Sequence, residues 1–453
     1  MTLVRYMAAI MSMLVFQVSF STIGEGQVLL ESNEEVAALF SDNRGNGVRP
    51  DLQKNATLDD YIKVALLNNP GLKASFEKWN TAFEKIDPAR TLPDPRFTYT
   101  NYIEEVETRV GAQKHSIGMA QTFPWFGKLD LRGEIAIQFA NAEKQRYEAE
   151  KLKLISLIKK IYHEYSYLAQ AIKITRNNIT LVSNFESIAR TRYKGGVGRQ
   201  NAVIKTQVEL GKLQDRILSL KDSIRPVAAK LNSAMNRPSQ MPLSLPDMIS
   251  EEKIDFTDTQ LISMLQRKNP QLKALDLIAE REKNSIKLSK KDYFPDVTLG
   301  VSYIDTDSRF DANPPDNGKD PIIANISINI PLWRKKYNAQ TRGAEAQYRT
   351  AVQNRIEKEN ALIADLEIAL YELRDADRKN ILYRETLLLK AEQNVKINQQ
   401  AFTSGKASFL DLIDSQRVLL EFQLVQKRAL ADYAKALAAI EMLTGGNLER
   451  KIK

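Results

Sequence analysis

The chain has no cysteine and only two histidines among its 453 residues. Without cysteine there can be no disulfide, no thiolate metal ligand, no thiol nucleophile and no lipid attached to sulfur. His115 and His163 lie far apart, in a predicted strand and a predicted helix, so a histidine-ligated metal centre is not expected. The motifs G-x-S-x-G, H-E-x-x-H and G-x-x-x-x-G-K-[ST] are also missing. We therefore predict that the protein is not an enzyme and has neither a resident metal nor a cofactor.

Long apolar runs are missing too, apart from one at the N-terminus. Arg5 is followed by a mostly apolar run over about residues 7–20, and small polar residues end it at Ser21. This order is typical of a secretory signal peptide over residues 1–21, and a buried helix is the alternative. No later stretch reaches the roughly 20 apolar residues of a transmembrane helix. An exported chain of this kind is either soluble or crosses a membrane as strands.

The net charge of +9 does not by itself indicate a nucleic-acid partner. Lysines and arginines are spread along predicted helical faces with acids among them, as in the run EKQR at residues 143–146. We interpret these faces as solvated surface and predict no nucleic acid as a partner.

The sequence contains an internal duplication. Three pairs of segments correspond: LNNPGLKA at 67–74 and RKNPQLKA at 267–274, FPWFGK at 123–128 and IPLWRK at 330–335, and residues 193–207 and 402–416. The offset grows only from 200 residues (267 minus 67) to 209 (402 minus 193). Such a slow drift indicates one unit that was duplicated and then acquired short insertions.

Proline is absent from two long intervals, although the chain has sixteen prolines. The intervals 125–225 and 332–453 can therefore form long uninterrupted helices. Apolar residues within them step by three and four, which is typical of coiled-coil packing. Glycine-bearing tips at 194–198 and 403–406 divide each interval into a helical hairpin. A helix from the start of the first hairpin to its tip would be roughly 100 Å long, so we predict an extended tube or rod.

Each repeat also contains two short segments in which apolar residues alternate with small or polar ones. They lie at about 96–104 and 114–123 in the first repeat and at about 295–305 and 322–331 in the second. Their length and alternation are typical of strands that cross a bilayer, with the apolar side facing lipid. Four strands cannot close a barrel in lipid, so several chains must share one.

Aromatic residues bracket these strands at the ends that join the helices. They are Phe123, Trp125, Phe126, Tyr293, Phe294 and Trp333. Rings in such places are typical of the girdles at a membrane interface, although rings beside any sheet can also be part of a core. The sequence therefore predicts contact with membrane lipid.

Taken together, these features resemble the TolC-like outer-membrane efflux proteins over residues 57–446. The duplication, the Asn-Pro near the start of each half and the patterns F-x-x-G at 402–405 and D-x-x-D-x-Q at 411–416 are similar to that family. The stretch GMAQTFPWFGKL at 118–129 is more similar to the branch that serves heavy-metal pumps, the CzcC and CusC type.

The resemblance implies a mostly α-helical fold with a small β part. It implies a homotrimer whose chains share a 12-stranded barrel in the outer membrane of a Gram-negative-type bacterium, with a helical tunnel in the periplasm. The assembly would be a passive exit duct, joined to a periplasmic adaptor and to an inner-membrane pump of the RND type. Heavy-metal cations are the implied substrate, with drugs or polypeptides of type I secretion as alternatives. Lipidated members such as CusC have a cysteine after the signal, and its absence here would leave anchoring to the barrel alone.

Asp411 and Asp414 are the main candidates for a pore site. They lie three positions apart on one predicted helical face, and the resemblance implies that they match acidic rings at the periplasmic mouth. Threefold symmetry would gather two carboxylates from each chain at the narrowest point and so favour cations. Alternatively, Ser408 and Asp411 have the spacing of a capping box. The first repeat has Ala202 and Lys205 at the equivalent positions, so only the second hairpin offers these carboxylates.

Other tip residues are predicted to form the gate and to contact the adaptor. They are Gly196, Arg199, Phe402, Gly405, Lys406 and Ser408. The resemblance implies that aromatic and basic groups near the tip hold the mouth closed. In this chain Phe402 has no hydroxyl, and Ala407 stands where TolC has arginine. Lys406 or Arg199 would replace the missing contact, or else they are ordinary solvated tip residues.

An exported coiled-coil scaffold is the alternative from another functional class. It would explain the long helices and the basic faces, but it leaves the four alternating segments without a role.

The sequence predicts six divisions of the chain. They are a signal peptide (1–21), an N-terminal extension (22–56), a first repeat (57–238) with its long hairpin at 127–236, a linker (239–256), a second repeat (257–446) with its hairpin at 333–444, and a C-terminal tail (447–453).

Overall fold

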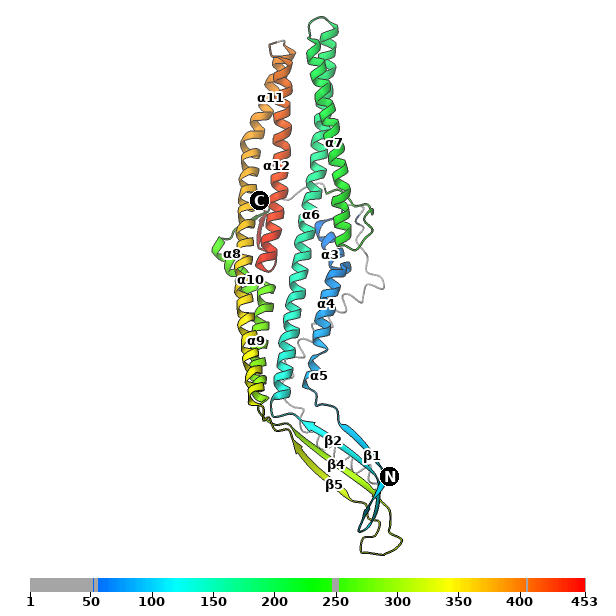
Figure 1. Ribbon diagram of the computed structural model, residues 1–453. Helices are drawn as coiled ribbons and strands as arrows, with labels where there is room; N and C mark the ends of the chain where they lie inside the picture. The colour runs from blue at the N-terminus through cyan, green and yellow to red at the C-terminus, as the bar shows by residue number, and fades with distance from the viewer. Residues whose placement is uncertain (1–51, 53–55, 247–251, 405, 453) are drawn as a thin grey trace. The chain divides into compact units, whose positions relative to one another are not determined.

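The computed structural model describes residue 52 and residues 56–246, 252–404 and 406–452. The predicted signal peptide, most of the predicted N-terminal extension and Gly405 lie outside the described residues. Long helices make up most of the described chain, and the main β element is a four-stranded sheet (Figure 1).

The chain divides into two compact units. As far as they are described, the sheet unit comprises Trp79–Asn141 and Arg281–Glu345, and the helical unit comprises Val48–Lys78, Ala142–Glu280 and Ala346–Lys453. Each unit therefore contains corresponding pieces of both halves of the chain, as a duplicated sequence would supply.

The two repeats contain the same kinds of elements in the same order. The first has α3 (Leu58–Asn68), α4 (Pro70–Phe83), α5 (Ile86–Arg90), β1 (Arg96–Thr108), β2 (Gly111–Phe123), α6 (Lys128–Lys194) and α7 (Gln200–Ala234). The second has α8 (Asp258–Lys268), α9 (Pro270–Lys291), β4 (Val297–Thr306), β5 (Ile322–Ile328), α10 (Arg334–Leu382), the π-helical segment η2 (Tyr383–Leu387), α11 (Leu388–Thr403) and α12 (Phe409–Thr444).

Both repeats begin with a capping box and then break at an Asn-Pro pair. Thr57 and Thr257 each accept a hydrogen bond from the backbone N–H three residues further along the chain. Asn69 and Asn269 end α3 and α8, and a proline then starts the next helix, where a missing N–H costs nothing.

The repeated asparagine also ties the start of each repeat to the end of its hairpin. The Asn69 amide donates to the carbonyl of Ala234, the last residue of α7, at 2.8 Å. The Asn269 amide makes the same bond to Leu443, near the end of α12, at 2.9 Å. In both cases the side-chain oxygen accepts a backbone N–H of the following helix, so one side chain satisfies groups at two helix ends.

The second hairpin is not the uninterrupted helix that its lack of proline predicted. The π-helical segment η2 separates α10 from α11, whereas α6 continues over 67 residues without a break. The repeat offset grows from 207 (331 minus 124) to 209 (402 minus 193) over this stretch, so the second hairpin has extra residues here. A π turn absorbs an added residue while the flanking turns keep their apolar faces. Pro226 lies inside α7 without ending it.

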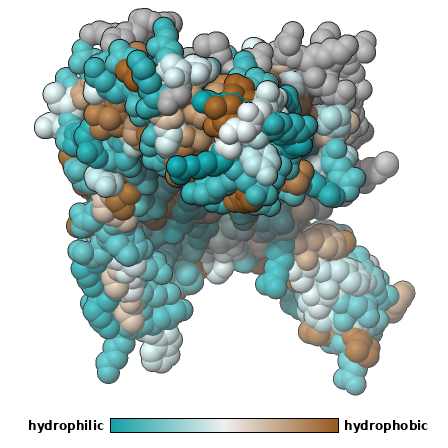
Figure 2. Space-filling view, turned by 90° about the horizontal axis from the view of Figure 1, so that it is seen from above, coloured by the Kyte–Doolittle hydropathy of each residue, from teal (hydrophilic) through white to brown (hydrophobic). Residues whose placement is uncertain are grey.

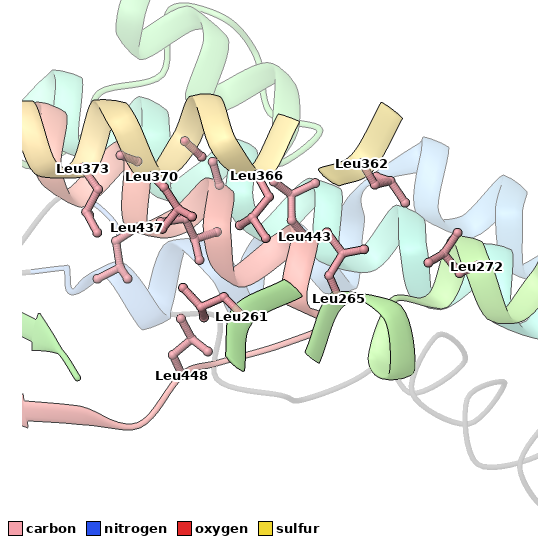
Figure 3. Close-up of a cluster of buried hydrophobic side chains, with 14 residues drawn as sticks. Leu261, Leu265, Leu272, Leu362, Leu366, Leu370, Leu373, Leu437, Leu443 and Leu448 are labelled. Atoms are coloured by element: carbon pink, nitrogen blue, oxygen red, sulfur yellow. The ribbon is translucent and has the colours of Figure 1, made fainter. Parts of the chain in front are cut away.

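Leucines form the core where α8, α9, α10 and α12 meet in the helical unit. Figure 3 shows Leu261 and Leu265 of α8 in one cluster with Leu366 of α10 and Leu443 of α12. Each is almost fully removed from solvent. Burial of a leucine side chain contributes about 1.5–3 kcal/mol, so this cluster is a main source of the unit's stability.

The sheet has the strand order β1-β2-β4-β5, and every pair is antiparallel. The strand pairs of the two repeats therefore join between β2 and β4, where Phe123 is opposite Val297. At the far end of the β1–β2 hairpin, Gly111 has φ +134°, and a Cβ there would lie 1.5 Å from the carbonyl oxygen of Asp307. Only glycine fits at this position.

The strand limits differ from the predicted ones at both ends. β1 continues past 104 to Thr108, across a register shift between Asn101 and Val106 that hides its alternation in the sequence. β5 ends at Ile328 instead of 331, because its partner β4 begins only at Val297, after a proline that has no N–H to donate.

The predicted linker and tail contain a small second sheet. β3 (Glu252–Ile254) pairs antiparallel with β6 (Arg450–Ile452). This pairing joins segments that are far apart in sequence, and neither segment has a local pattern that predicts a strand.

The surface of the described chain is mixed in polarity. Figure 2 shows mostly hydrophilic residues on the face seen from above, with separate hydrophobic patches. None of the described helices is long enough and apolar enough to serve as a membrane span.

Candidate functional site

The four-stranded sheet has two chemically different faces. Residues opposite one another in register share a face of a sheet, and neighbours along a strand point to opposite faces. One face is mostly apolar and consists of Phe97, Tyr99, Ile117, Met119, Phe123, Val297, Leu299, Val301, Tyr303, Ile322, Ala324, Ile326 and Ile328, with Gln121 and, toward the hairpin turn, Asn101, His115 and Asp305 as polar members. The other has mostly small and polar residues, namely Thr98, Thr100, Ser116, Gly118, Ala120, Thr122, Thr298, Gly300, Ser302, Asn325 and Ser327, together with Arg96, Ile304 and Ile323.

Contacts on each face agree with this division. The hydroxyl oxygens of Thr122 and Thr298 lie 2.9 Å apart across β2 and β4 on the polar face. On the apolar face, Ile326 is 76% exposed and Phe97 is 62% exposed in the single chain. An apolar surface of this extent marks a site that contacts protein or membrane.

The predicted interface aromatics gather where strands and helices join in the sheet unit. Trp125 stacks on Phe294 with ring centroids 5.2 Å apart and meets Phe126 edge-on at 5.7 Å. Tyr293 packs against Tyr337. Trp333 and Phe126 remain mostly exposed, so these rings are not part of a closed core in the single chain.

Lys128, which the sequence did not single out, anchors this junction. It is 3% exposed, and its ammonium group lies 2.8 Å from a carboxylate oxygen of Asp296. The same oxygen accepts the backbone N–H of Trp125 at 2.8 Å. The ion pair of Lys128 with Asp296 holds the start of α6 against the start of β4. The only sequence signal for Lys128 was its correspondence with Lys335 in the second repeat.

The two hairpins of the helical unit end in short turns. Gly196 has φ +73° in the turn between α6 and α7, a conformation that favours glycine. At the start of α12, the Asp411 carboxylate accepts the backbone N–H of Ser408 at 3.1 Å, and the Ser408 hydroxyl accepts the backbone N–H of Asp411 at 3.3 Å. This capping box confirms the alternative interpretation of Asp411 as part of a helix cap. The Asp411 side chain is also exposed to solvent.

Asp414 is 74% exposed, one turn further along α12. Arg417 reaches it at 3.4 Å but bonds more closely to Glu209 of α7, at 2.7 Å. The hydrogen bond that Arg417 donates to Glu209 raises the pKa of Arg417, which is a permanent cation between the hairpins. In the described part of the chain, no three His, Cys, Asp or Glu side chains are grouped so that they could hold a metal ion.

Arg192 connects the two tips and was missed by the sequence analysis. Its guanidinium donates to the carbonyl of Phe402 at 2.6 Å and lies 4.9 Å from the centre of that ring. Phe402 meets Phe409 edge-on at 5.3 Å, within a buried cluster that joins the two hairpins. The residue of the second repeat that corresponds to Arg192 is Ala401. This difference between the two copies was the signal in the sequence that could have pointed to Arg192.

A groove of about 510 Å³ lies between the two tips. Four of the predicted tip residues line it, namely Arg199, Phe402, Lys406 and Ser408. Arg192 and Lys205 line it as well. Gly196 is not among its lining residues, and Gly405 lies outside the described residues.

The comparison with protein families identifies the duplicated architecture. Residues 61–237 and 261–446 each match the family model described as outer membrane efflux protein. The chain belongs to the outer membrane efflux protein family. This is a family of efflux channels and not an enzyme family, and the efflux protein is accordingly an outer-membrane protein. The predicted family and the predicted fold class, mostly helical with a small β part and an internal duplication, are confirmed.

Individual relatives are similar over much of their length. The "Toxin and drug export protein A" of Aggregatibacter actinomycetemcomitans is 22% identical over 320 residues, which cover 66% of this chain and 67% of the relative. The solved structure of the outer membrane protein VceC from Vibrio cholerae is 17% identical, with a TM-score of 0.70 over 86% of this chain and 97% of VceC. A solved structure of CusC is 13% identical, with a TM-score of 0.70 over 89% of this chain and 95% of CusC. At these identities the structural likeness establishes the fold alone.

Proposed function

We propose that three copies of this efflux protein form a passive exit duct through the outer membrane. The observation that carries the proposal is the two-faced sheet: its apolar face suits lipid, and its face of small hydroxyl, amide and glycine residues suits an aqueous lumen. A soluble sheet on the surface of a scaffold would not need such a large exposed apolar face.

The edges of this sheet support an assembly in which several chains share one barrel. β1 and β5 are its outer strands, and within the described residues neither has a partner on its other side. Open edges are not tolerated in lipid, and single-chain bacterial barrels begin at about eight strands. Three chains with four strands each give the 12-stranded barrel proposed for the family fold, with the helical hairpins forming the periplasmic tunnel.

The proposed gate is a ring of Asp411 and Asp414 at the periplasmic mouth. Both carboxylates are exposed in the single chain, and the two-carboxylate pattern occurs only in the second hairpin. Six carboxylates in the trimer would favour cations over anions. Phe402 and the basic residues Arg199 and Lys406 are proposed to hold the tip, with Arg192 as the contact between hairpins.

The gate is tested by single-channel currents in planar bilayers. The double variant Asp411→Asn, Asp414→Asn should lose most of the cation preference while it keeps the backbone fold, because asparagine can still accept at the helix start. Glu421→Gln, an exposed acid further along α12, is the matched control. An unchanged reversal potential in the double variant would remove the pore role from these residues.

The duct is proposed to work with a periplasmic adaptor and an inner-membrane pump of the RND type. A passive channel has no energy source of its own, so transport against a gradient requires a driven partner. The tip residues Gly196, Arg199, Phe402, Lys406 and Ser408 are the proposed adaptor contacts, because they lie at or beside the groove between the hairpin tips.

Heavy-metal cations are the proposed substrate class, on the basis of the segment 118–129 and its similarity to the metal-pump branch. Drugs or secreted polypeptides are the second candidate, and the name of the Aggregatibacter relative, a toxin and drug export protein, favours them. Deleting the gene and measuring growth with heavy-metal salts beside a panel of hydrophobic drugs separates the two. Hypersensitivity to metals alone supports the first candidate, and hypersensitivity to drugs alone supports the second.

A further inference from the structure

An exposed apolar row leads from β5 to the start of α10. Ile326 and Ile328 belong to the mostly apolar face of the sheet, and Ile330, Leu332 and Trp333 follow them along the chain. Each of these side chains is more than half exposed in the single chain, and Trp333 is 76% exposed. The surface proposed to contact lipid therefore continues beyond the last strand and ends at an aromatic ring.

Three cations follow this row directly. Arg334, Lys335 and Lys336 begin α10, and all three side chains are exposed. Among the described residues none of the three forms an ion pair, and the ammonium group of Lys336 lies 5.5 Å from the centre of the Tyr337 ring. The first turn of α10 contains no acid, although acids are the charged residues that stabilise the first turn of a helix. These positive charges are therefore left for a partner outside the chain.

The duplication shows that the fold itself does not require this arrangement. Lys335 corresponds to Lys128, the buried lysine at the start of α6. Lys128 is neutralised within the chain, because its ammonium group lies 2.8 Å from Asp296. The first turn of α6 also contains Asp130, which corresponds to Tyr337 in the second repeat. One copy of the junction satisfies its charges internally, and the other presents them to its surroundings.

Two further lysines lie at the same junction in the sheet unit. Lys290 and Lys291 end α9, and Lys290 is exposed. The end of α9 lies beside the start of α10, because the rings of Tyr293 and Tyr337 have their centres 5.5 Å apart. The two acids between α9 and β4 are directed to the buried Lys128. The exposed charge beside the apolar row is therefore mainly positive.

We propose that Arg334, Lys335 and Lys336 bind the phosphate group of an anionic glycerophospholipid, whose acyl chains lie along the apolar row that ends at Trp333. This inference rests on the proposed function, which puts the sheet in the bilayer and the helical hairpins in the periplasm. The junction of strands and helices then lies at the leaflet that faces the periplasm. Adjacent cations beside an aromatic anchor attract an anionic headgroup more strongly than a zwitterionic one.

The test uses the purified full-length protein in phosphatidylcholine vesicles. Bromine atoms on an acyl chain quench tryptophan fluorescence at short range, so a brominated lipid reports its own presence beside Trp333. One series adds brominated phosphatidylglycerol, which is anionic, and the other adds brominated phosphatidylcholine, which is zwitterionic. Parallel samples of Trp333→Phe give the signal of the other two tryptophans, which is subtracted.

We expect the anionic lipid to reach half-maximal quenching of Trp333 at about a fivefold lower mole fraction than the zwitterionic lipid, at about 50 mM salt. Most of this preference should be lost at about 500 mM salt, because screening shortens the range of the charges. Inorganic phosphate at matched ionic strength should not displace the lipid, since a free ion has no acyl chains to lie on the apolar row. Displacement by phosphate would overturn the lipid assignment.

Two variants assign the preference to the cations at the start of α10. Arg334→Gln, Lys335→Gln, Lys336→Gln should remove the preference and keep the quenching by phosphatidylcholine, because Trp333 and the apolar row are unchanged. Lys212→Gln, Lys221→Gln, Lys396→Gln removes the same charge at exposed positions of the helical unit and should behave as the wild type does. Equal quenching of the wild type by both lipids, or a preference that survives in the first variant, would overturn the inference.

The outcome for the proposed duct is read from the zwitterionic lipid. If both lipids quench Trp333 equally, the sheet remains in the bilayer and only the anionic lipid is removed from the proposal. If neither lipid quenches Trp333 in vesicles that contain the protein, the sheet is not in the bilayer, and the proposed duct is wrong together with this inference.

Discussion

At the residue scale, the helical unit separates charges that form internal contacts from charges that face outward. Glu164 of α6 illustrates the first kind, because it is half-buried and binds both Arg428 and Lys435 of α12. Asp414 illustrates the second, since most of its side chain is exposed. Only the second kind is available for a gate or a partner, and the sequence alone does not distinguish the two.

Glu164 leads to a prediction about pH. Burial acts to raise the pKa of this carboxyl, but hydrogen bonds and charge from Lys435 and Arg428 outweigh it and lower the pKa below its ordinary value. The unfolded chain then binds the proton more readily, so the contribution to stability is complete above about pH 4.5 and is lost as the pH falls through the folded pKa.

The measurement compares thermal unfolding of the wild type and Glu164→Gln at pH 7 and at about pH 3. We expect the variant to melt lower at pH 7 and the difference to shrink at the acidic pH. Glu150→Gln, which breaks an exposed pair with Lys153, should change little at either pH. A difference that stays constant with pH would show that Glu164 acts through packing rather than charge.

At the element scale, the repeated asparagine is the clearest device of the fold. Asn69 and Asn269 each end one helix, cap the next and bond to the end of a hairpin that lies far along the chain. The helix break has a local signal in the sequence, because the residue before a proline is disfavoured in a helix. The sequence could not predict the bond to the hairpin, because that bond depends on how the helices pack.

We predict that Asn269→Ala destabilises the protein by about 1–3 kcal/mol, because it leaves a buried carbonyl and a helix N-terminus without partners. Asn269 is 2% exposed, whereas Asn69 is only partly buried, so Asn69→Ala should cost less. Urea unfolding of the detergent-solubilised protein measures both. Gln393→Ala, at an exposed position of α11, is the control, and equal effects of all three substitutions would contradict the role.

Sequence patterns did not predict the irregular elements, which are the π-helical segment η2 and the β3–β6 pair. The only sequence signal for the π-helical segment η2 was the growth of the repeat offset, and that growth did not show where in the hairpin the extra residues lie. The β3–β6 pair has no local signal, because three-residue strands form only when a distant partner supplies the hydrogen bonds.

At the scale of the whole molecule, family membership and the two-faced sheet point to the same environment. The chain is an outer membrane efflux protein, and large exposed apolar faces like that of its sheet are rare on water-soluble monomers. The trimer, the shared barrel and the partners are proposals that agree with a place in the outer membrane.

Adjacent residues of β5 test the proposed orientation of the sheet. Ile326 lies on the apolar face and Ser327 on the polar face, and both are exposed in the single chain. Ile326→Lys should cost about 2–4 kcal/mol near the middle of the bilayer and lower the amount of protein assembled in the outer membrane. Ser327→Lys should assemble normally and instead change the conductance, because it would face the lumen.

The amount of detergent-extractable trimer in the outer-membrane fraction decides between these outcomes. If both lysine variants assemble equally well, the apolar face does not contact lipid. If only Ser327→Lys fails, the two faces are reversed.

By itself, the sequence determined what depends on neighbours along the chain: the duplication, the long helices, the alternation of the strands, the caps and the family resemblance. These follow from residue spacing and from the presence or absence of proline, which act over a few turns. The tertiary structure alone decided that β2 pairs with β4, that Arg192 joins the two tips, and that four cations from separate segments line one groove without a carboxylate. Such features require residues distant in sequence to meet, and only the packing of the helices and strands brings them together.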